Sequence, residues 1–325
     1  MTRASAGIDR PVARAIGAAA LVAALALESH GAWAAPAVGP RPAESRVAIV
    51  VAHDKTLVPV RFDGARELHL ILDTGMGYDG VLLFRPGLKD SIGMRHPIAA
   101  KIGGAGGGPP SEALFSDSMS FRIGDAGFEN QRVIVLAGGA MATGTADGVI
   151  GYSVLGHYAV AIDFDSLTLT LHEPQGFTPA PGWTSLALEF GKNDLPFVTT
   201  SIVVRDEPPV SLRSYIDCAS SETIELLLRP GMKFTLPKRT EDADLGRGLS
   251  GDIRGKRGVI SRLILGPYAL RQVRAAFVPA EIRSKAGSAD AVLANAALRR
   301  FNLVFDYAHS RLLIRPNRHF GDPFR

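Results

Sequence analysis

The chain has 325 residues, 46% of them hydrophobic and 21% charged, which is enough apolar material for one large core or two smaller ones. Its formal net charge is only +4, and its basic residues are scattered rather than interleaved with aromatics, so we expect no nucleic acid partner. A single cysteine, Cys218, excludes an internal disulfide. With 35 glycines, 21 prolines and 7% aromatic residues, the composition is typical of a turn-rich β protein.

The N-terminal segment has the parts of a secretory signal peptide. Three arginines precede a 13-residue apolar run at 15–27, and the small residues Ala32 and Ala34 stand where a signal peptidase cleaves. We therefore predict a signal peptide over 1–35 and an exported protein, periplasmic or secreted. An uncleaved membrane anchor is the alternative, but the run is shorter than the roughly 20 residues that span a bilayer. After cleavage we expect no stable membrane insertion.

The rest of the chain reads mostly as strands of four to eight residues. Helices are expected only over 153–158 and 291–300. The absence of long βαβ spacing argues against a Rossmann or TIM-barrel architecture. The expected strands are 46–52, 57–62, 68–72, 197–204, 212–216, 258–265 and 273–278.

The sequence also repeats itself. Asp73 lies in Leu-Ile-Leu-Asp-Thr-Gly and Asp217 in Ser-Tyr-Ile-Asp-Cys-Ala, each after β-prone residues and before small, turn-forming ones. The leucine pairs at 82–83 and 226–227 follow the two aspartates at equal offsets. We therefore align the two segments as counterparts.

Two further landmarks keep the same order. A Gly-rich stretch follows each aspartate by about thirty residues, at 103–108 and 245–255. The segment Asp-Gly-Val-Ile-Gly at 147–151 then lies 74 residues after the first aspartate, and Asp-Ala-Val-Leu-Ala at 290–294 lies 73 residues after the second. Three landmarks in matching order predict two homologous lobes.

We predict an all-β protein of two pseudo-twofold-related β-barrel lobes with short helices. The expected lobes are 36–176 and 177–325, and a Pro- and Gly-rich stretch at 174–182 is suited to connect them.

One aspartate from each lobe supplies a pair of carboxylates. Two carboxylates about 3 Å apart cannot both ionise, so they share a proton. The ionised member deprotonates a water and the protonated member polarises the scissile carbonyl. The pattern predicts Asp73 and Asp217 as a catalytic dyad that needs no metal and no cofactor. Because Asp-Thr-Gly turns are common, a purely structural turn is the alternative for each aspartate.

These landmarks resemble those of the retropepsin family, within the pepsin and retropepsin superfamily of aspartic proteases. The resemblance covers roughly residues 46–316 and is most specific at Asp73, Thr74 and Gly75. It implies that Thr74 and Gly75 support the active-site turn, with the Thr hydroxyl bracing one turn against the other. In the second lobe Cys218 and Ala219 stand at these positions, so the brace is expected to be weaker there.

The resemblance also implies that the two Gly-rich stretches are flaps over an extended peptide. Gly104 and Gly106 belong to the first flap, and Gly248 and Gly251 to the second. Neither stretch contains an aromatic residue, whereas pepsin-like enzymes carry one flap with a tyrosine. The chain is therefore more similar to two retropepsin lobes fused in one polypeptide.

Other chemistries fit the sequence less well. A Cys218 nucleophile would need a positioned histidine, and none is near in sequence. The Gly-rich stretch at 103–108 precedes two prolines rather than a helix, which disfavours a phosphate-binding loop; a solvated loop is the alternative for both stretches. No His-Glu-x-x-His pattern is present, so the sequence does not support a zinc hydrolase.

We expect an exported aspartic endopeptidase that cleaves an extended polypeptide, with a monomer as the simplest form. One alternative keeps only the first lobe active and pairs the Asp73 residues of two chains, which requires a dimer. Another is a peptide-binding module of the same fold that has lost turnover, which the altered second lobe suggests.

Overall fold

Strands dominate the fold. The computed structural model describes residues 37–38, 42–138, 141 and 144–324, and the predicted signal peptide lies outside them. Strands hold 53% of the residues and helices 9%, which confirms the expected mostly-β class. The described residues belong to one compact unit, Ala34–Arg325, and the boundary expected near residue 176 stays a prediction within it.

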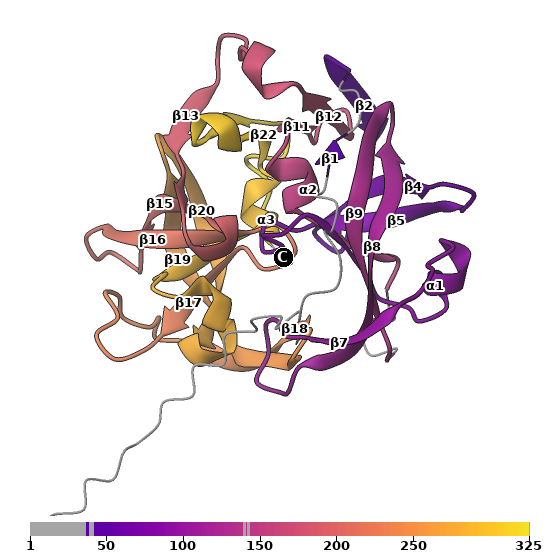
Figure 1. The fold of residues 1–325 in the computed structure, drawn as a ribbon. Helices are drawn as coiled ribbons and strands as arrows, with labels where there is room; N and C mark the ends of the chain where they lie inside the picture. Colours follow the sequence, from indigo (N-terminus) through magenta and orange to yellow (C-terminus); the bar gives the residue numbers. More distant parts are fainter. Residues whose placement is uncertain (1–36, 39–41, 139–140, 142–143, 325) are drawn as a thin grey trace, which may run out of the picture. The chain divides into compact units, whose positions relative to one another are not determined.

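A first ring of six strands comes from the N-terminal half of the chain (Figure 1). The strands pair in the order β4, β5, β10, β6, β9 and β8, and β8 closes the ring on β4. Strands β3, β7 and β1 extend it beside β4, β8 and β9. The bounds are β1 Ala37–Val38, β3 Val50–Ala52, β4 Lys55–Phe62, β5 Glu67–Leu72, β6 Gly80–Leu83, β7 Ile98–Ile102, β8 Ser111–Ile123, β9 Ala126–Leu136 and β10 Gly148–Ile150.

A second ring comes from the C-terminal half and pairs in the order β15, β16, β21, β17, β20 and β19, with β19 closing on β15. Strands β14 and β18 extend it beside β15 and β19. In both rings the second strand pairs in parallel with the third, and the fourth with the fifth. The bounds are β14 Glu189–Phe190, β15 Pro196–Val203, β16 Val210–Asp217, β17 Ile224–Leu228, β18 Thr240–Gly248, β19 Gly251–Leu265, β20 Tyr268–Pro279 and β21 Ala291–Ala294.

A six-stranded sheet joins the two halves, at the top of Figure 1. Its central pair is β11 from the first half against β22 from the second. In β12 the buried Leu169 and Leu171 alternate with more exposed threonines, as expected for a strand with one covered face. The bounds, in sheet order, are β13 Thr184–Ala187, β23 Arg311–Pro316, β22 Phe301–Asp306, β11 Ala159–Asp163, β12 Thr168–His172 and β2 Glu44–Ala48.

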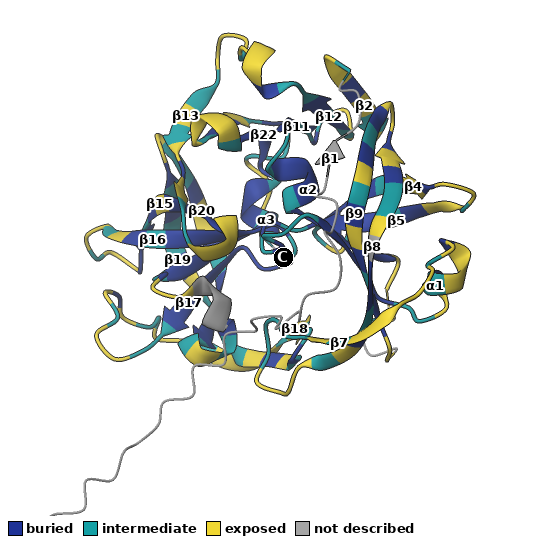
Figure 2. Ribbon diagram, in the orientation of Figure 1, coloured by how far each residue is buried: buried dark blue, intermediate teal, exposed yellow. Residues whose placement is uncertain are grey.

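The helices are single turns. Figure 2 shows that α2 and α3, near the centre of the view, are largely buried, whereas many outer loops are exposed. Within the described ranges, no helix has the length and apolar character to cross a membrane. The bounds are α1 Leu88–Ser91, α2 Tyr152–Leu155 and α3 Asn295–Leu298, with 3-10 turns η1 Pro174–Gly176, η2 Lys192–Asp194, η3 Ala280–Ala286 and η4 Tyr307–His309.

Several expected elements differ from the structure. The helix expected over 153–158 begins at Tyr152 and ends at Leu155. The strand expected over 46–52 is broken at the buried Ile49, because the chain passes there from the six-stranded sheet, as β2, to the first ring, as β3. The helix expected over 291–300 begins only at Asn295. Its first four residues form β21 instead, since they are buried and bonded between β16 and β17.

The strands that carry the two leucine pairs, 82–83 and 226–227, are offset by one residue relative to the alignment predicted from the sequence. Gly148 pairs with Leu83 in the first ring, whereas its counterpart Ala291 pairs with Leu226 in the second. The predicted match of 82–83 with 226–227 is therefore wrong by one position. The connection after the aspartate is one residue shorter in the second ring, so Leu226 corresponds to Leu83 and Glu225 to Leu82.

One hydrogen bond from a backbone N–H to an aspartate side chain recurs in both rings. The Asp147 carboxylate accepts the His69 backbone N–H at 2.9 Å, and the Asp290 carboxylate accepts the Arg213 N–H at 3.0 Å. His69 and Arg213 each lie four residues before the aspartate of their ring. Asp147 and Asp290 therefore tie the third landmark to the strand that leads into each site aspartate.

Candidate active site

Asp73 directly follows β5, in the tight turn that the sequence predicts. Its backbone N–H donates to the Ile150 carbonyl at 2.8 Å, which anchors the turn to β10. Its Oδ1 accepts the Gly75 N–H at 2.7 Å. A glycine is required at position 75, because a Cβ there would overlap the Tyr215 hydroxyl and crowd the Asp73 carboxylate.

Asp217 is the last residue of β16 and occupies the same place in the second ring. Its Oδ1 accepts the backbone N–H groups of Ala219 at 2.9 Å and Ser220 at 3.0 Å. Its residue surface is only 7% exposed. Ala219 replaces the glycine of the first turn, and it packs against the apolar residues that the first ring presents to the site.

Thr74 braces one turn against the other. Its buried hydroxyl donates to the Ile216 carbonyl at 2.6 Å and accepts the Cys218 N–H at 3.0 Å. The Cys218 side chain is also buried, and burial raises the pKa of its thiol, although a hydrogen bond with Thr74 opposes this. A thiol held in its neutral form does not suit a nucleophile, so Cys218 acts as a small buried residue.

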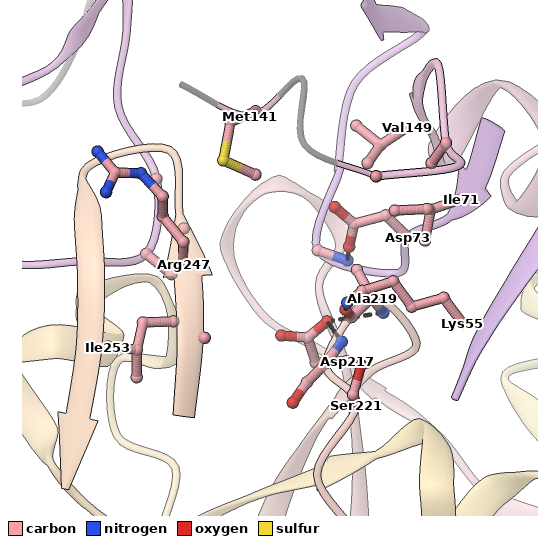
Figure 3. A pocket seen from close by; sticks show the side chains of 18 of the residues that line it. Lys55, Ile71, Asp73, Met141, Val149, Asp217, Ala219, Ser221, Arg247 and Ile253 are labelled. Carbon is pink, nitrogen blue, oxygen red and sulfur yellow. Dashed lines mark hydrogen bonds between the residues drawn. The ribbon is translucent and has the colours of Figure 1, made fainter. Parts of the chain in front are cut away.

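Asp73 and Asp217 line one cavity of about 620 Å³. Figure 3 shows the two side chains at the same end of this cavity, on adjacent turns. Ile71, Val149 and Met141 lie on the Asp73 side, and Ile253 and Arg247 lie across from them. The volume is within the range typical of ligand pockets.

The Gly-rich hairpins meet over this cavity. The β7–β8 tip and the β18–β19 tip, at the bottom of Figure 1, are joined through Ser250. Its N–H donates to the Ala105 carbonyl at 2.9 Å, its carbonyl accepts the Gly108 N–H at 2.5 Å, and its hydroxyl accepts the Gly104 N–H at 3.1 Å. The Ser111 hydroxyl also donates to the Leu249 carbonyl at 2.7 Å. The two tips form a continuous roof, which we call the flap junction.

The four glycines predicted for the flaps divide into two groups. Gly104 and Gly248 line the cavity. Gly106 and Gly251 lie at the flap junction, where both adopt a positive φ. A Cβ on Gly106 would overlap Ser250 and one on Gly248 would overlap the Ala105 carbonyl, so glycine permits the two tips to approach.

Lys55 brings a cation to the pair of aspartates. It is the first residue of β4, lines the cavity, and donates to the Ala219 carbonyl. Burial lowers the pKa of Lys55, and the charges of Asp217 and then Asp73 oppose that change. The negative charges of Asp217 and Asp73 therefore both favour the protonated form of the Lys55 ammonium group.

Arg283 supplies a second cation. Among the described residues, its contact with the pair of aspartates is with Asp217. Its Nη1 lies 3.3 Å from Asp217 Oδ2, and its Nε donates to Glu225 Oε2 at 2.6 Å. Glu225 also accepts the Ser220 hydroxyl at 2.7 Å. Burial lowers the pKa of Arg283, but the charges of Glu225 and Asp217 outweigh burial and raise it. The guanidinium is thus fixed as a cation next to Asp217.

The sequence prediction missed Lys55, Glu225 and Arg283. Glu225 gave a usable signal, because it interrupts the apolar run of β17, and a charge in a buried strand requires a partner. Arg283 gave none, since it lies 66 residues from Asp217 in the chain. Lys55 follows a turn of polar residues and resembles any exposed lysine in sequence.

Comparison with known proteins adds no family assignment. No protein-family model matches the chain, and no curated protein matches it in sequence.

Proposed function

We propose that the chain is an aspartic endopeptidase in which Asp73 and Asp217 activate water to hydrolyse a peptide bond. One observation carries the proposal: two carboxylates on matched, hydrogen-bonded turns line a single cavity beneath two meeting hairpins. Because both acids belong to one chain, the proposal favours a monomer over a dimer that pairs two copies of Asp73.

We further propose that the two rings are pseudo-twofold-related lobes of the retropepsin kind, fused in one chain. The matching order of the six strands and the parallel pairs at the same places support this relation. The equivalent bonds from Asp147 to His69 and from Asp290 to Arg213 support it as well. The Thr74 brace is the contact that the family resemblance implies between the two turns.

The chemistry needs the two acids in different protonation states. The ionised carboxylate accepts a proton from water as the oxygen attacks the carbonyl carbon, and the protonated carboxyl donates a hydrogen bond to the carbonyl oxygen. The resulting tetrahedral species collapses when the amine leaves with a proton from the dyad. The cavity beneath the two meeting hairpins suits an extended backbone, so we propose an unfolded or flexible polypeptide as substrate.

The test uses the mature chain, exported through the proposed signal peptide, and an unfolded protein as substrate. Asp73→Asn and Asp217→Asn should each abolish cleavage, while Asp147→Asn, which alters an acid outside the cavity, should leave measurable activity in folded protein. Full activity in either site variant would contradict the proposal. Sedimentation of the active species separates a monomer from a dimer joined through Asp73.

A second candidate is a peptide-binding module without turnover. The two cations favour it, because Lys55 interacts with both acids and Arg283 with Asp217, and this pair must hold a proton for hydrolysis. In that case a peptide binds the wild-type chain and stays intact across the whole pH range. Isothermal titration with mass spectrometry of the recovered peptide distinguishes the two candidates.

A further inference from the structure

A buried ion pair stands behind one aspartate. The Glu225 residue is 0% exposed and Arg283 is 9% exposed, and the two side chains are joined by two hydrogen bonds. Arg283 extends from this pair to the Asp217 carboxylate at 3.3 Å. Ser220 connects the other side, since its hydroxyl donates to Glu225 and its N–H donates to Asp217.

The first ring has an apolar residue at the matching position. Leu82 pairs with Val149 in the first ring as Glu225 pairs with Val292 in the second. Leu82 is buried in the apolar cluster that lines the cavity. A buried ion pair rarely stabilises a fold more than well-packed apolar residues do, because both charges lose their hydration. The pair in the second ring therefore calls for a role other than stability.

The charges around Asp217 point to that role. Arg283 approaches it from η3, Lys55 from β4 and Asp73 from the turn after β5. Lys55 donates to the Ala219 carbonyl, in the turn that carries Asp217. A nearby cation favours the ionised form of a carboxyl group, and a charge-assisted hydrogen bond adds to this effect. Both cations thus act in the same direction on the same acid.

We propose that Arg283 is a positioning residue that makes the two aspartates unequal, holding Asp217 as the ionised member so that the shared proton resides on Asp73. This inference rests on the proposed function. In this arrangement Asp217 accepts the proton of the attacking water, and Asp73 donates its hydrogen bond to the scissile carbonyl. Glu225 and Ser220 keep the guanidinium in place.

Selective chemical labelling tests the assignment without any turnover. An aryloxy epoxide is opened by a carboxylate, whose oxygen forms an ester while the epoxide oxygen takes up a proton. A diazoacetyl amino acid ester is protonated by a carboxylic acid, loses N2 and forms an ester with the same group. With the mature wild-type chain we expect the epoxide on Asp217 and the diazo reagent on Asp73, as mapped by tandem mass spectrometry. The reverse distribution, or an even one, overturns the proposal.

A second measurement needs no reagent. The carboxyl carbons of 13C-labelled aspartate report protonation by their chemical shift, and the two site signals are identified by their loss in Asp73→Asn and Asp217→Asn. We expect an ionised shift for Asp217 and a protonated shift for Asp73 in the wild-type chain. An ionised Asp73 beside a protonated Asp217 contradicts the proposal.

The variants avoid leaving a charge buried alone. The double variant Glu225→Leu with Arg283→Met removes the whole pair and restores the kind of residue found at Leu82. It should fold, lose the preference of each reagent for one aspartate, and lower kcat by about tenfold with little change in KM, as expected for a lost charge-assisted hydrogen bond. Arg283→Lys keeps the positive charge and should keep the preference. If the double variant labels as the wild type does, Arg283 is not what makes the aspartates unequal.

The two proposals fail in different ways. The proposed function fails if Asp73→Asn and Asp217→Asn leave peptide hydrolysis unchanged. The inference about Arg283 fails if the label distribution or the 13C shifts show equal aspartates, and that result is obtained whether or not peptide is cleaved.

Discussion

The turns that carry Asp73 and Asp217 share a backbone scheme but differ in their surroundings. Each lies at the end of the second strand of its ring, and each aspartate carboxylate accepts the N–H two residues on, at 2.7 and 2.9 Å respectively. The first turn lies against apolar side chains such as Leu82, whereas the second lies against the ion pair of Arg283 and Glu225. Matching backbone geometry therefore does not imply that the two acids behave alike.

The comparison also separates what each turn must keep from what it can change. The first turn needs Gly75 because Tyr215 crowds it, while Ala219 is accommodated in the second. The first turn supplies the brace through Thr74, and the second contributes only backbone groups to those two bonds. One well-formed turn can therefore position a partner turn whose sequence differs from its own.

The strongest test of the pair is whether its members act as a unit. Asp73→Asn and Asp217→Asn should each lower kcat by about 10³-fold or more, and the double variant should be no worse than either single change, because a dyad that has lost one acid gains nothing from the other. Steady-state kinetics on one peptide measures all three. Additive losses in the double variant would mean that the two acids work independently.

The flap junction offers the next largest effect. Gly248→Ala and Gly106→Ala each place a Cβ against the opposite hairpin, so the roof must shift, and kcat/KM should fall about 100-fold through misplaced substrate. Gly107→Ala is the matched control, because its Cβ would point into open space. Equal activity in all three variants would show that hydrolysis does not depend on how the tips meet.

The Thr74 brace should make protein stability more sensitive to a substitution in the first turn than to one in the second. Thr74→Val removes the donor to Ile216 and the acceptor for the Cys218 N–H in a buried place, and should lower the free energy of unfolding by about 2–4 kcal/mol. Cys218→Ala, the matched change on the other turn, keeps the backbone N–H and removes only one small buried group, so it should lower the free energy of unfolding by only about 1 kcal/mol. Urea unfolding of both variants makes the comparison, and similar losses would mean that the brace is reciprocal.

The smallest effect concerns Lys55 and pH. Burial lowers its pKa below the ordinary 10.5, with Asp217 and Asp73 opposing, so just below pH 10.5 the unfolded chain binds more protons than the folded one. Stability therefore gains from Lys55 as pH rises through that window. Lys55→Met should remove this gain, seen as a difference in urea unfolding between variant and wild type. Lys101→Met, at an exposed lysine, controls for the loss of a positive charge.

Sequence reasoning predicted the elements whose signal is local. The turn at Asp73, its counterpart at Asp217 and the two Gly-rich hairpins all rest on short patterns that repeat along the chain. It erred at Ala291–Ala294, where four apolar residues suit a helix as well as a strand, and burial between β16 and β17 decides for the strand.

The environment of the site could not be predicted in the same way. Arg283 reaches Asp217 only because η3 packs against the second ring, and Lys55 reaches Ala219 across the two halves of the chain. Contacts of this kind depend on the tertiary fold, and the residues next to Lys55 or Arg283 in the sequence do not predict them. Repeats reveal what two segments share, while the features that make them differ need three dimensions.

The flap junction also contains a backbone amide whose hydrogen exchange reports how often the two hairpin tips separate. The Ser250 amide is bonded to the Ala105 carbonyl at 2.9 Å, so its proton exchanges with deuterium only when the tips separate. At a pH where chemical exchange is faster than reclosing, the exchange rate of this one amide equals the rate at which the two tips separate. If turnover with a saturating substrate equals that rate, the step that limits the protein is the parting of two hairpins and not the breaking of a covalent bond.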